Sequence, residues 1–177
     1  MKRIVTAIAV AALLAPSVAG GQTLPPRERR GREDVDCRAN EPGRAYRLTL
    51  SGLKDRQGRL WLDLYPASRD DFLAPDRELI QSGTPFRRVI AAIPQSGPVV
   101  LCIRAPGPGR WALSVLHDRD GDGRFGFLRD GAGFPRNPRL RRAKPEVDRV
   151  ALPVTRGVVE TTVIMNYRRG LGFGPIG

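Results

Sequence analysis

Three carboxylates stand at alternate positions ahead of a glycine in the segment 117–123, His-Asp-Arg-Asp-Gly-Asp-Gly. Oxygen ligands at this spacing can converge on one hard cation such as calcium. Laid on a helix-loop-helix calcium loop, Asp118, Asp120 and Asp122 occupy the first, third and fifth positions. The candidate metal ligands are Asp118, Asp120, Asp122, the backbone carbonyl of Arg124, and Asp130.

The segment also departs from such a calcium loop. Its twelfth position is Arg129 where a bidentate Glu is typical, so Asp130, carbonyls or water would have to complete the coordination. The alternative is that Asp and Gly only supply the side-chain-to-backbone bonds and positive φ angles of successive tight turns. Both interpretations stay open, and a calcium site here is expected to be weak and structural.

His117 is the only histidine in the chain. A catalytic base needs a nucleophile or a polarised water within reach, and Ser114 is expected to point to the opposite face of the same strand. A single imidazole also excludes zinc or copper sites built on several histidines. We therefore predict no catalytic residue and expect a rim histidine whose ring hydrogen-bonds the acidic loop and anchors it.

Most of the chain alternates apolar and polar residues with the period of half-buried strands. Before the acidic loop, Trp111, Leu113 and Val115 share a face that His117 continues. A capping pattern at 68–71 predicts one short helical turn that Pro75 ends. The predicted strands are 46–51, 60–64, 88–93, 99–104, 110–117, 148–154 and 158–165. The expected fold is all-β, an antiparallel sandwich of about seven strands, immunoglobulin-like or transthyretin-like.

The run 109–124, followed by Gly-Phe-Pro-Arg-Asn-Pro at 133–138, resembles a family of secreted bacterial proteins catalogued as domain-of-unknown-function family 2141. A closing strand that ends in Tyr167 fits the same pattern. The resemblance covers about residues 46–167 and implies a small exported β-domain without known enzymology. After the acidic loop the family commonly carries a longer insert with a Gly-x-Pro-x-Glu segment, which residues 125–130 replace here without a Glu.

The first residues predict export. Lys2 and Arg3 precede an apolar stretch at 4–14 and small residues at 17–19, the pattern of a signal peptide over residues 1–19. The apolar stretch is shorter than the roughly 20 residues of a membrane-spanning helix. We expect a periplasmic or secreted protein that does not span the membrane. A poorly ordered Arg/Pro-rich leader (20–43), the β-sandwich (44–167) and a Gly-rich tail (168–177) would follow.

Two cysteines, Cys37 and Cys102, remain after the predicted cleavage. An even number in an oxidising compartment favours a disulfide, and closing a loop of this length stabilises a fold by about 4 kcal/mol on the chain-entropy model. A buried free thiol at Cys102 is the alternative. The predicted bridge would attach the leader to the domain.

The chain carries 30 basic and 18 acidic residues, a formal net charge of +12. Scattered arginines without interleaved aromatics disfavour nucleic acid as a partner. The expected function is a non-enzymatic binding or structural module of the cell envelope, with an envelope component, glycan or protein as partner. The alternative is an arginine-driven binder of polyanions or the envelope surface. A hydrolase using His117 and Asp118 ranks last.

Overall fold

A computed structural model describes residues 26–31, 43–140 and 143–176 of the 177-residue chain. The predicted signal peptide, residues 1–19, lies outside the described residues, so export stays a prediction. Cys37 also lies outside them, and its bridge to Cys102, a buried residue, stays a prediction as well. Among the described residues, no helix has the length and apolar character needed to cross a membrane.

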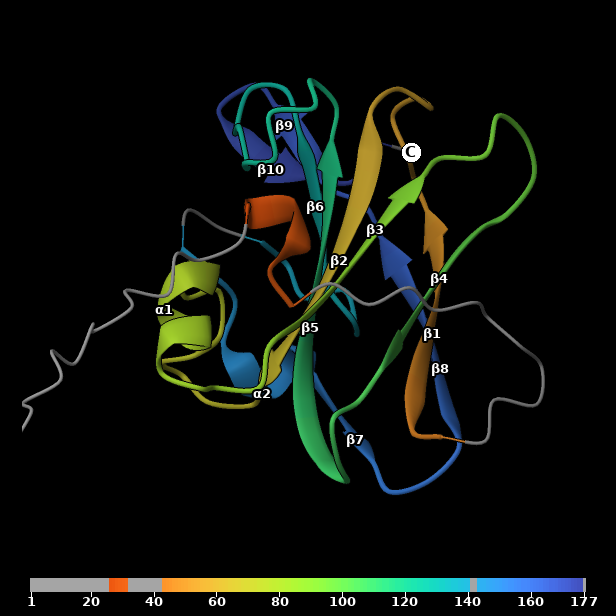
Figure 1. Ribbon diagram of the computed structural model, residues 1–177. Helices are drawn as coiled ribbons and strands as arrows, with labels where there is room; N and C mark the ends of the chain where they lie inside the picture. The colour runs from red at the N-terminus through yellow and green to blue at the C-terminus, as the bar shows by residue number, and fades with distance from the viewer. Residues whose placement is uncertain (1–25, 32–42, 141–142, 177) are drawn as a thin grey trace, which may run out of the picture.

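Two packed β-sheets form the body of the protein (Figure 1). The smaller has the order β4-β1-β8, and the larger has the order β3-β2-β5-β6 with β7 also paired to β5. Each predicted strand is present at least in part, and the sandwich prediction is confirmed. The strands are β1 (Ala45–Ser51), β2 (Arg59–Pro66), β3 (Arg87–Ala92), β4 (Val99–Arg104), β5 (Gly109–Asp118), β6 (Gly131–Gly133), β7 (Ala151–Val154) and β8 (Val158–Ile164).

One pair of strands differs from the predicted antiparallel arrangement. β1 and β8 are parallel, with Ala45 opposite Val158 and Ser51 opposite Ile164. Parallel neighbours need a crossover connection instead of a tight turn. Almost the whole domain lies between these two strands in sequence and serves as that connection, so no local turn signal could announce the pairing.

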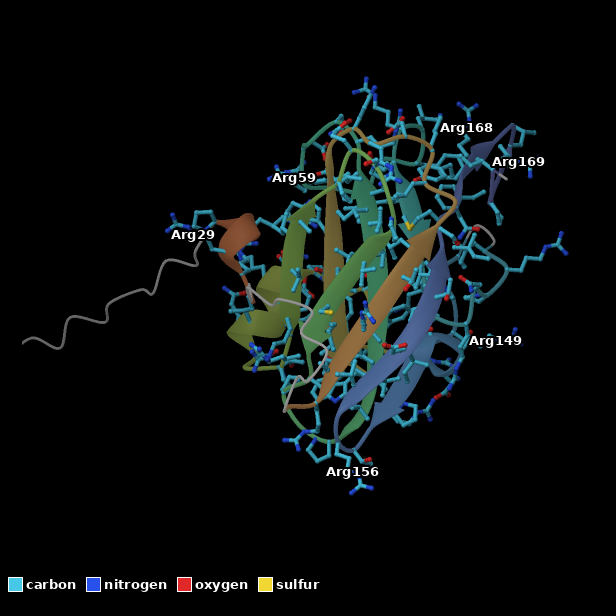
Figure 2. The ribbon with its side chains drawn as sticks, turned by 90° about the vertical axis from the view of Figure 1, so that its right-hand side faces the viewer. Arg29, Arg59, Arg149, Arg156, Arg168 and Arg169 are labelled. Atoms are coloured by element: carbon cyan, nitrogen blue, oxygen red, sulfur yellow. The ribbon has the colours of Figure 1, made fainter. Side chains whose placement is uncertain are left out.

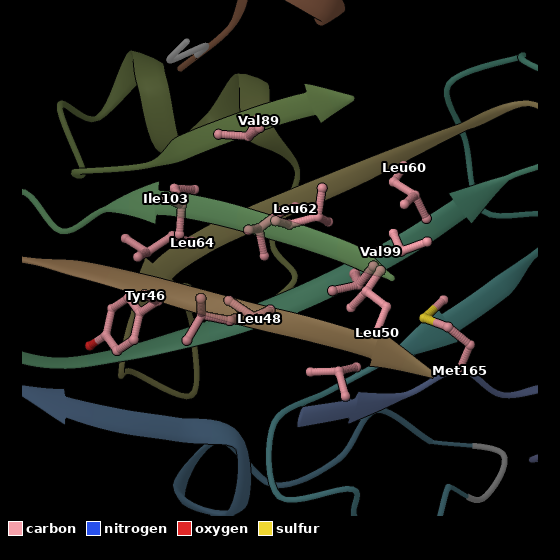
Figure 3. Packing of buried hydrophobic residues seen from close by; sticks show 14 of the residues in the cluster. Tyr46, Leu48, Leu50, Leu60, Leu62, Leu64, Val89, Val99, Ile103 and Met165 are labelled. Atoms are coloured by element: carbon pink, nitrogen blue, oxygen red, sulfur yellow. The ribbon is translucent and has the colours of Figure 1, made fainter. Parts of the chain in front are cut away.

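The main core lies between the two sheets, where alternate leucines of β1 and β2 meet (Figure 3). Leu48, Leu60 and Leu62 are fully buried there. Burying one such side chain is worth roughly 1.5–3 kcal/mol. The same core takes Leu113 and Val115 from β5, so it fixes the direction in which β5 delivers the acidic segment to the rim of the sandwich.

The outer face of the larger sheet is covered too. Trp61, Asp63 and Tyr65 alternate with the core leucines of β2, and all three are buried. α1 (Asp76–Gln81), α2 (Val147–Val150) and their connections pack over this face and form a second apolar cluster around Tyr65 and Phe72. β2 is therefore buried on both faces, whereas its sequence pattern predicted a half-buried strand.

α1 begins directly after Pro75 and is a separate element from the short helical turn predicted before this proline. The predicted turn exists, since the Asp71 amide donates to Ser68 Oγ (3.2 Å) and the Phe72 amide to the Ser68 carbonyl (3.1 Å). Proline lacks an N–H, and the start of a helix needs none, so proline favours the beginning of a helix. The predicted strand at 148–154 is shorter in the structure, because its first residues belong to α2, which ends at Val150, and β7 begins at Ala151.

Segments from the predicted leader and tail pack on the body. η1 (Arg27–Arg29) belongs to the leader, and beside it the Arg30 guanidinium donates to Asp76 Oδ1 at 2.9 Å. In the predicted tail, β9 (Tyr167–Arg169) and β10 (Gly172–Gly174) form a short hairpin. Figure 1 shows η1, α1 and this hairpin on the side of the larger sheet that faces away from β1, β4 and β8.

Candidate metal centre and outer-face cavity

β5 ends in the acidic segment, and residues 119–130, which we call the rim loop, lead to β6. Strand parity places the last two residues of β5 on opposite faces. His117 continues the core-facing row of Leu113 and Val115, as predicted. Asp118 instead contacts Trp61 on the outer face of the sheet.

His117 is fully buried, and both of its ring nitrogens are engaged. Nε2 lies 2.8 Å from the Gln57 carbonyl, which can only accept, so Nε2 carries the proton. Nδ1 then accepts from the Tyr167 hydroxyl at 2.6 Å, and this hydroxyl accepts the Lys54 amide at 3.1 Å. Burial lowers the pKa of His117 and raises that of Tyr167 to about 12, which favours this neutral arrangement. His117 thus anchors residues 54–57 and Tyr167, where the sequence predicted the acidic loop as its partner.

Two glycines of β6 allow the closing segment, residues 163–167, to approach this strand closely. A Cβ on Gly131 would lie 2.3 Å from the Tyr167 ring, and one on Gly133 would lie 2.5 Å from the Val163 side chain. Any other residue would therefore push β6 away from the closing segment. The close approach gives a physical reason for the Gly-Phe motif at 133–134, which the sequence presented only as part of a resemblance.

Asp118 is fully buried and its two oxygens differ. Oδ2 accepts from the Trp61 indole N–H and from the Gly123 amide, both at 3.1 Å, and lies 3.4 Å from the Arg59 guanidinium. Oδ1 is buried and has no hydrogen-bond partner among the described residues. A carboxylate oxygen in this state costs free energy unless something neutralises it.

The structure brings Asp118 together with two of the other predicted ligands. One carboxylate oxygen each from Asp118, Asp120 and Asp130 lie within 4.8 Å of one another, so this cluster could hold a metal ion. Asp130 is buried and fixed, because its Oδ1 accepts the Arg119 amide (2.9 Å) and its Oδ2 accepts the Gly126 amide (2.7 Å). Asp120 is the exposed member and meets Arg129 Nη1 at 3.2 Å.

The other two predicted ligands have different positions. Asp122 is outside the cluster, and its Oδ1 accepts the Arg124 amide at 2.7 Å, which is the tight-turn role that the alternative interpretation assigned to it. Arg124 is one of the residues that line a cavity on the outer face of the sheet. The rim loop therefore follows neither sequence interpretation alone, because two of its aspartates are brought together with Asp118 while the third shapes a turn.

An ion pair between Arg119 and Asp55 holds the first residue of the rim loop. Arg119 Nε donates to Asp55 Oδ2 at 2.9 Å, and a second guanidinium nitrogen contacts the same oxygen. These hydrogen bonds lower the pKa of Asp55 and raise that of Arg119. The pair joins the rim loop to the β1–β2 connection that also receives His117.

Sequence reasoning missed a cavity of about 830 Å³ on the outer face of the larger sheet. β2 and β5 contribute Asp63, Tyr65 and Ser114 to its lining, while α1, the rim loop and β10 contribute further residues. Arg88 belongs to the same lining and donates two hydrogen bonds of 2.7 Å to Asp63 and one of 2.6 Å to Asp76. The only sequence signal was the pattern of polar and aromatic residues between the leucines of β2.

Comparison with known proteins agrees with the resemblance seen in the sequence. A family model described as "Uncharacterized protein conserved in bacteria (DUF2141)" matches residues 48–162, which is more than half of the chain. The chain belongs to the DUF2141 family. No curated protein and no solved structure matches the chain significantly. The match includes β5, the rim loop and β6 but not Tyr167, so it covers every member of the carboxylate cluster.

Proposed function

We propose that this DUF2141 protein is an exported, non-enzymatic binding module of the cell envelope whose rim loop binds calcium. The observation that carries the calcium site is the buried, unpartnered Oδ1 of Asp118 within a group of three carboxylates. A divalent cation would neutralise this oxygen. Calcium suits an irregular loop better than magnesium, because calcium accepts variable geometry whereas magnesium demands a near-ideal octahedron.

The hydrogen bonds of the cluster support such binding. Asp118 and Asp130 are already held by backbone amides and by the Trp61 indole. Only Asp120, which is exposed and paired with Arg129, would exchange its partner for the ion. Three carboxylates are few for calcium, which takes six to eight oxygens, so the remaining ligands would be water or carbonyls and the affinity modest.

The environment of His117 supports a non-enzymatic role. A general base must reach the proton that it removes, and both ring nitrogens of this only histidine are engaged with protein groups. Export is proposed from the signal-peptide pattern alone. The partner is proposed to be an envelope component, a glycan or another protein.

Terbium luminescence tests the metal site, because Trp61 contacts a proposed ligand and would sensitise a lanthanide bound there. We expect tryptophan-excited terbium emission that calcium displaces. Asp120→Ala should abolish it, whereas Asp122→Ala, which removes the same charge from the same loop outside the cluster, should retain it. Absence of sensitised emission, or an equal loss in both variants, would overturn the calcium site.

A second candidate function is arginine-driven binding to a polyanion of the envelope, favoured by the net charge of +12. Figure 2 shows labelled arginines such as Arg29, Arg156 and Arg168 projecting from different sides of the domain, so attraction would be diffuse. Retention on immobilised heparin distinguishes the two functions. Binding that collapses as salt rises favours the polyanion function, and salt-independent binding to an envelope fraction favours the first.

A further inference from the structure

The outer-face cavity has the size of a ligand site. Its volume of about 830 Å³ lies within the range of roughly 300–1,000 Å³ that is typical of small-molecule sites. Its lining comes from the sheet, α1 and the segment leading into it, the rim loop, β10, and residues near η1 and between β6 and α2. The hollow therefore lies between the outer face of the larger sheet and the segments that cover this face.

Part of the cavity lining is exposed and aromatic. Phe125 and Phe127 are 51% and 44% exposed, and both contact Phe173, with ring centroids 5.7 and 5.5 Å apart. All three rings line the cavity, as does the buried Phe134. Apolar surface gathered at one exposed place on a domain marks a binding site more often than scattered apolar residues do. These rings would cover the apolar part of a ligand.

The charged residues of the lining define the other part of the ligand. Among the described residues, six cationic residues and two carboxylates line the cavity, a formal charge of +4. Both carboxylates, Asp63 and Asp76, already bond Arg88. Within the described ranges, Lys144 Nζ donates only to the Arg69 and Phe72 carbonyls, at 3.0 and 2.9 Å.

Arg124 and Arg77 also line the cavity, and none of the described residues pairs with either guanidinium. Their charges and that of Lys144 meet no carboxylate in the described part of the chain. Cations beside low-dielectric walls attract anions. The lining therefore offers an apolar surface together with a surplus of positive charge.

We infer that the outer-face cavity binds an amphiphilic anion, a molecule with an apolar chain or ring and one carboxylate or phosphate head. The apolar part contacts Phe125, Phe127 and Phe134, and the head pairs with Arg124 or Lys144. The inference goes beyond the calcium site and does not require it, so binding is measured in the presence of a chelator.

Isothermal titration calorimetry of the mature protein with dodecyl phosphate, kept below its micelle-forming concentration, tests the inference. We expect saturable binding, with no binding of dodecyltrimethylammonium, which has the same chain and the opposite charge, or of inorganic phosphate. Arg124→Gln should weaken binding about tenfold, the loss expected for one charge-assisted hydrogen bond. Phe127→Ser should weaken it by a similar factor, about the worth of burying part of an aromatic ring.

Matched controls separate the cavity from general effects. Arg156→Gln removes an exposed arginine at the β7–β8 turn (Figure 2), and Leu171→Ser removes an 87% exposed apolar side chain outside the lining. Both controls should bind like the wild type. Equal loss in the controls, or equal affinity for the cationic amphiphile, would overturn the inference.

Two further results would identify a different occupant. If the protein sediments with phosphatidylglycerol vesicles but does not bind free dodecyl phosphate, a membrane surface is the ligand and the cavity is not the site. If a photo-crosslinker introduced as Phe127→p-benzoylphenylalanine captures residues 20–25 of the same chain, the leader occupies the cavity. Either result overturns the inference. Capture of dodecyl phosphate in competition with the crosslink supports it.

Discussion

Replacing Arg88 by methionine should destabilise the fold strongly. Arg88 is 2% exposed, and its guanidinium binds Asp63 and Asp76 while it lies 4.7 Å from the Trp61 ring centroid. Arg88→Met keeps most of the side-chain volume but leaves the buried Asp63 without a cation among the described residues, while Asp76 keeps only Arg30 and the more distant Arg27. Breaking a buried pair in this way costs about 3–5 kcal/mol. Each kcal/mol lowers the melting midpoint of a domain of this size by about 2–4 °C, so a fall of roughly 6–20 °C is expected.

Thermal melting followed by circular dichroism measures this effect against an exposed pair. Arg47 and Glu160 are 3.1 Å apart with side chains 46% and 69% exposed, so Arg47→Met should change stability by less than about 1 kcal/mol. Adding Asp63→Asn to Arg88→Met should recover part of the loss, because it removes the carboxylate that has lost its cation. If Arg88→Met melts as Arg47→Met does, the network does not act as a buried ion pair and the reasoning is refuted.

Three further results are expected. Burial alone would raise the pKa of Asp76, but hydrogen bonds from Arg88 and Arg30 lower it below 3.8. The ionised carboxylate therefore contributes fully to the free energy of unfolding above that pH, and this contribution is lost as the pH falls. In urea unfolding, the loss of stability caused by Asp76→Asn should shrink in acid, and a loss that stays constant with pH contradicts this. Tyr167→Phe removes a buried donor and should cost about 1–3 kcal/mol by the same assay, with no change in terbium binding. Calcium should tighten dodecyl phosphate binding, because the rim loop contributes residues to both sites. Dodecyl phosphate should then tighten calcium binding by the same factor. Equal affinities for dodecyl phosphate with calcium and with chelator would show that the two sites are independent.

The sequence predicted the sheets well because the main core imposes a period of two on every strand that it contacts. Trp111, Leu113, Val115 and His117 lie on one face as the parity rule requires. The second apolar cluster was missed because Trp61, Asp63 and Tyr65 look like an amphipathic, partly solvated face until α1 and the rim loop cover them. Pairing of Asp63 with Arg88 depends on the register of β2 and β3, in which these two residues are direct partners, and alternation alone does not determine register.

At the candidate metal site too, residue spacing alone does not determine which side chains come together. From their alternate spacing, Asp118, Asp120 and Asp122 were expected to be equivalent ligands. In the structure, Asp118 points to the outer face at the end of β5, and Asp122 accepts the Arg124 amide in a tight turn. Asp130 joins the cluster because the Arg119 and Gly126 amides hold its carboxylate. The same loop then carries Phe125 and Phe127 into the cavity lining. One short segment thus contributes two carboxylates to the candidate ion site and two aromatic rings to the cavity lining, which is the reason to expect the two sites to be coupled.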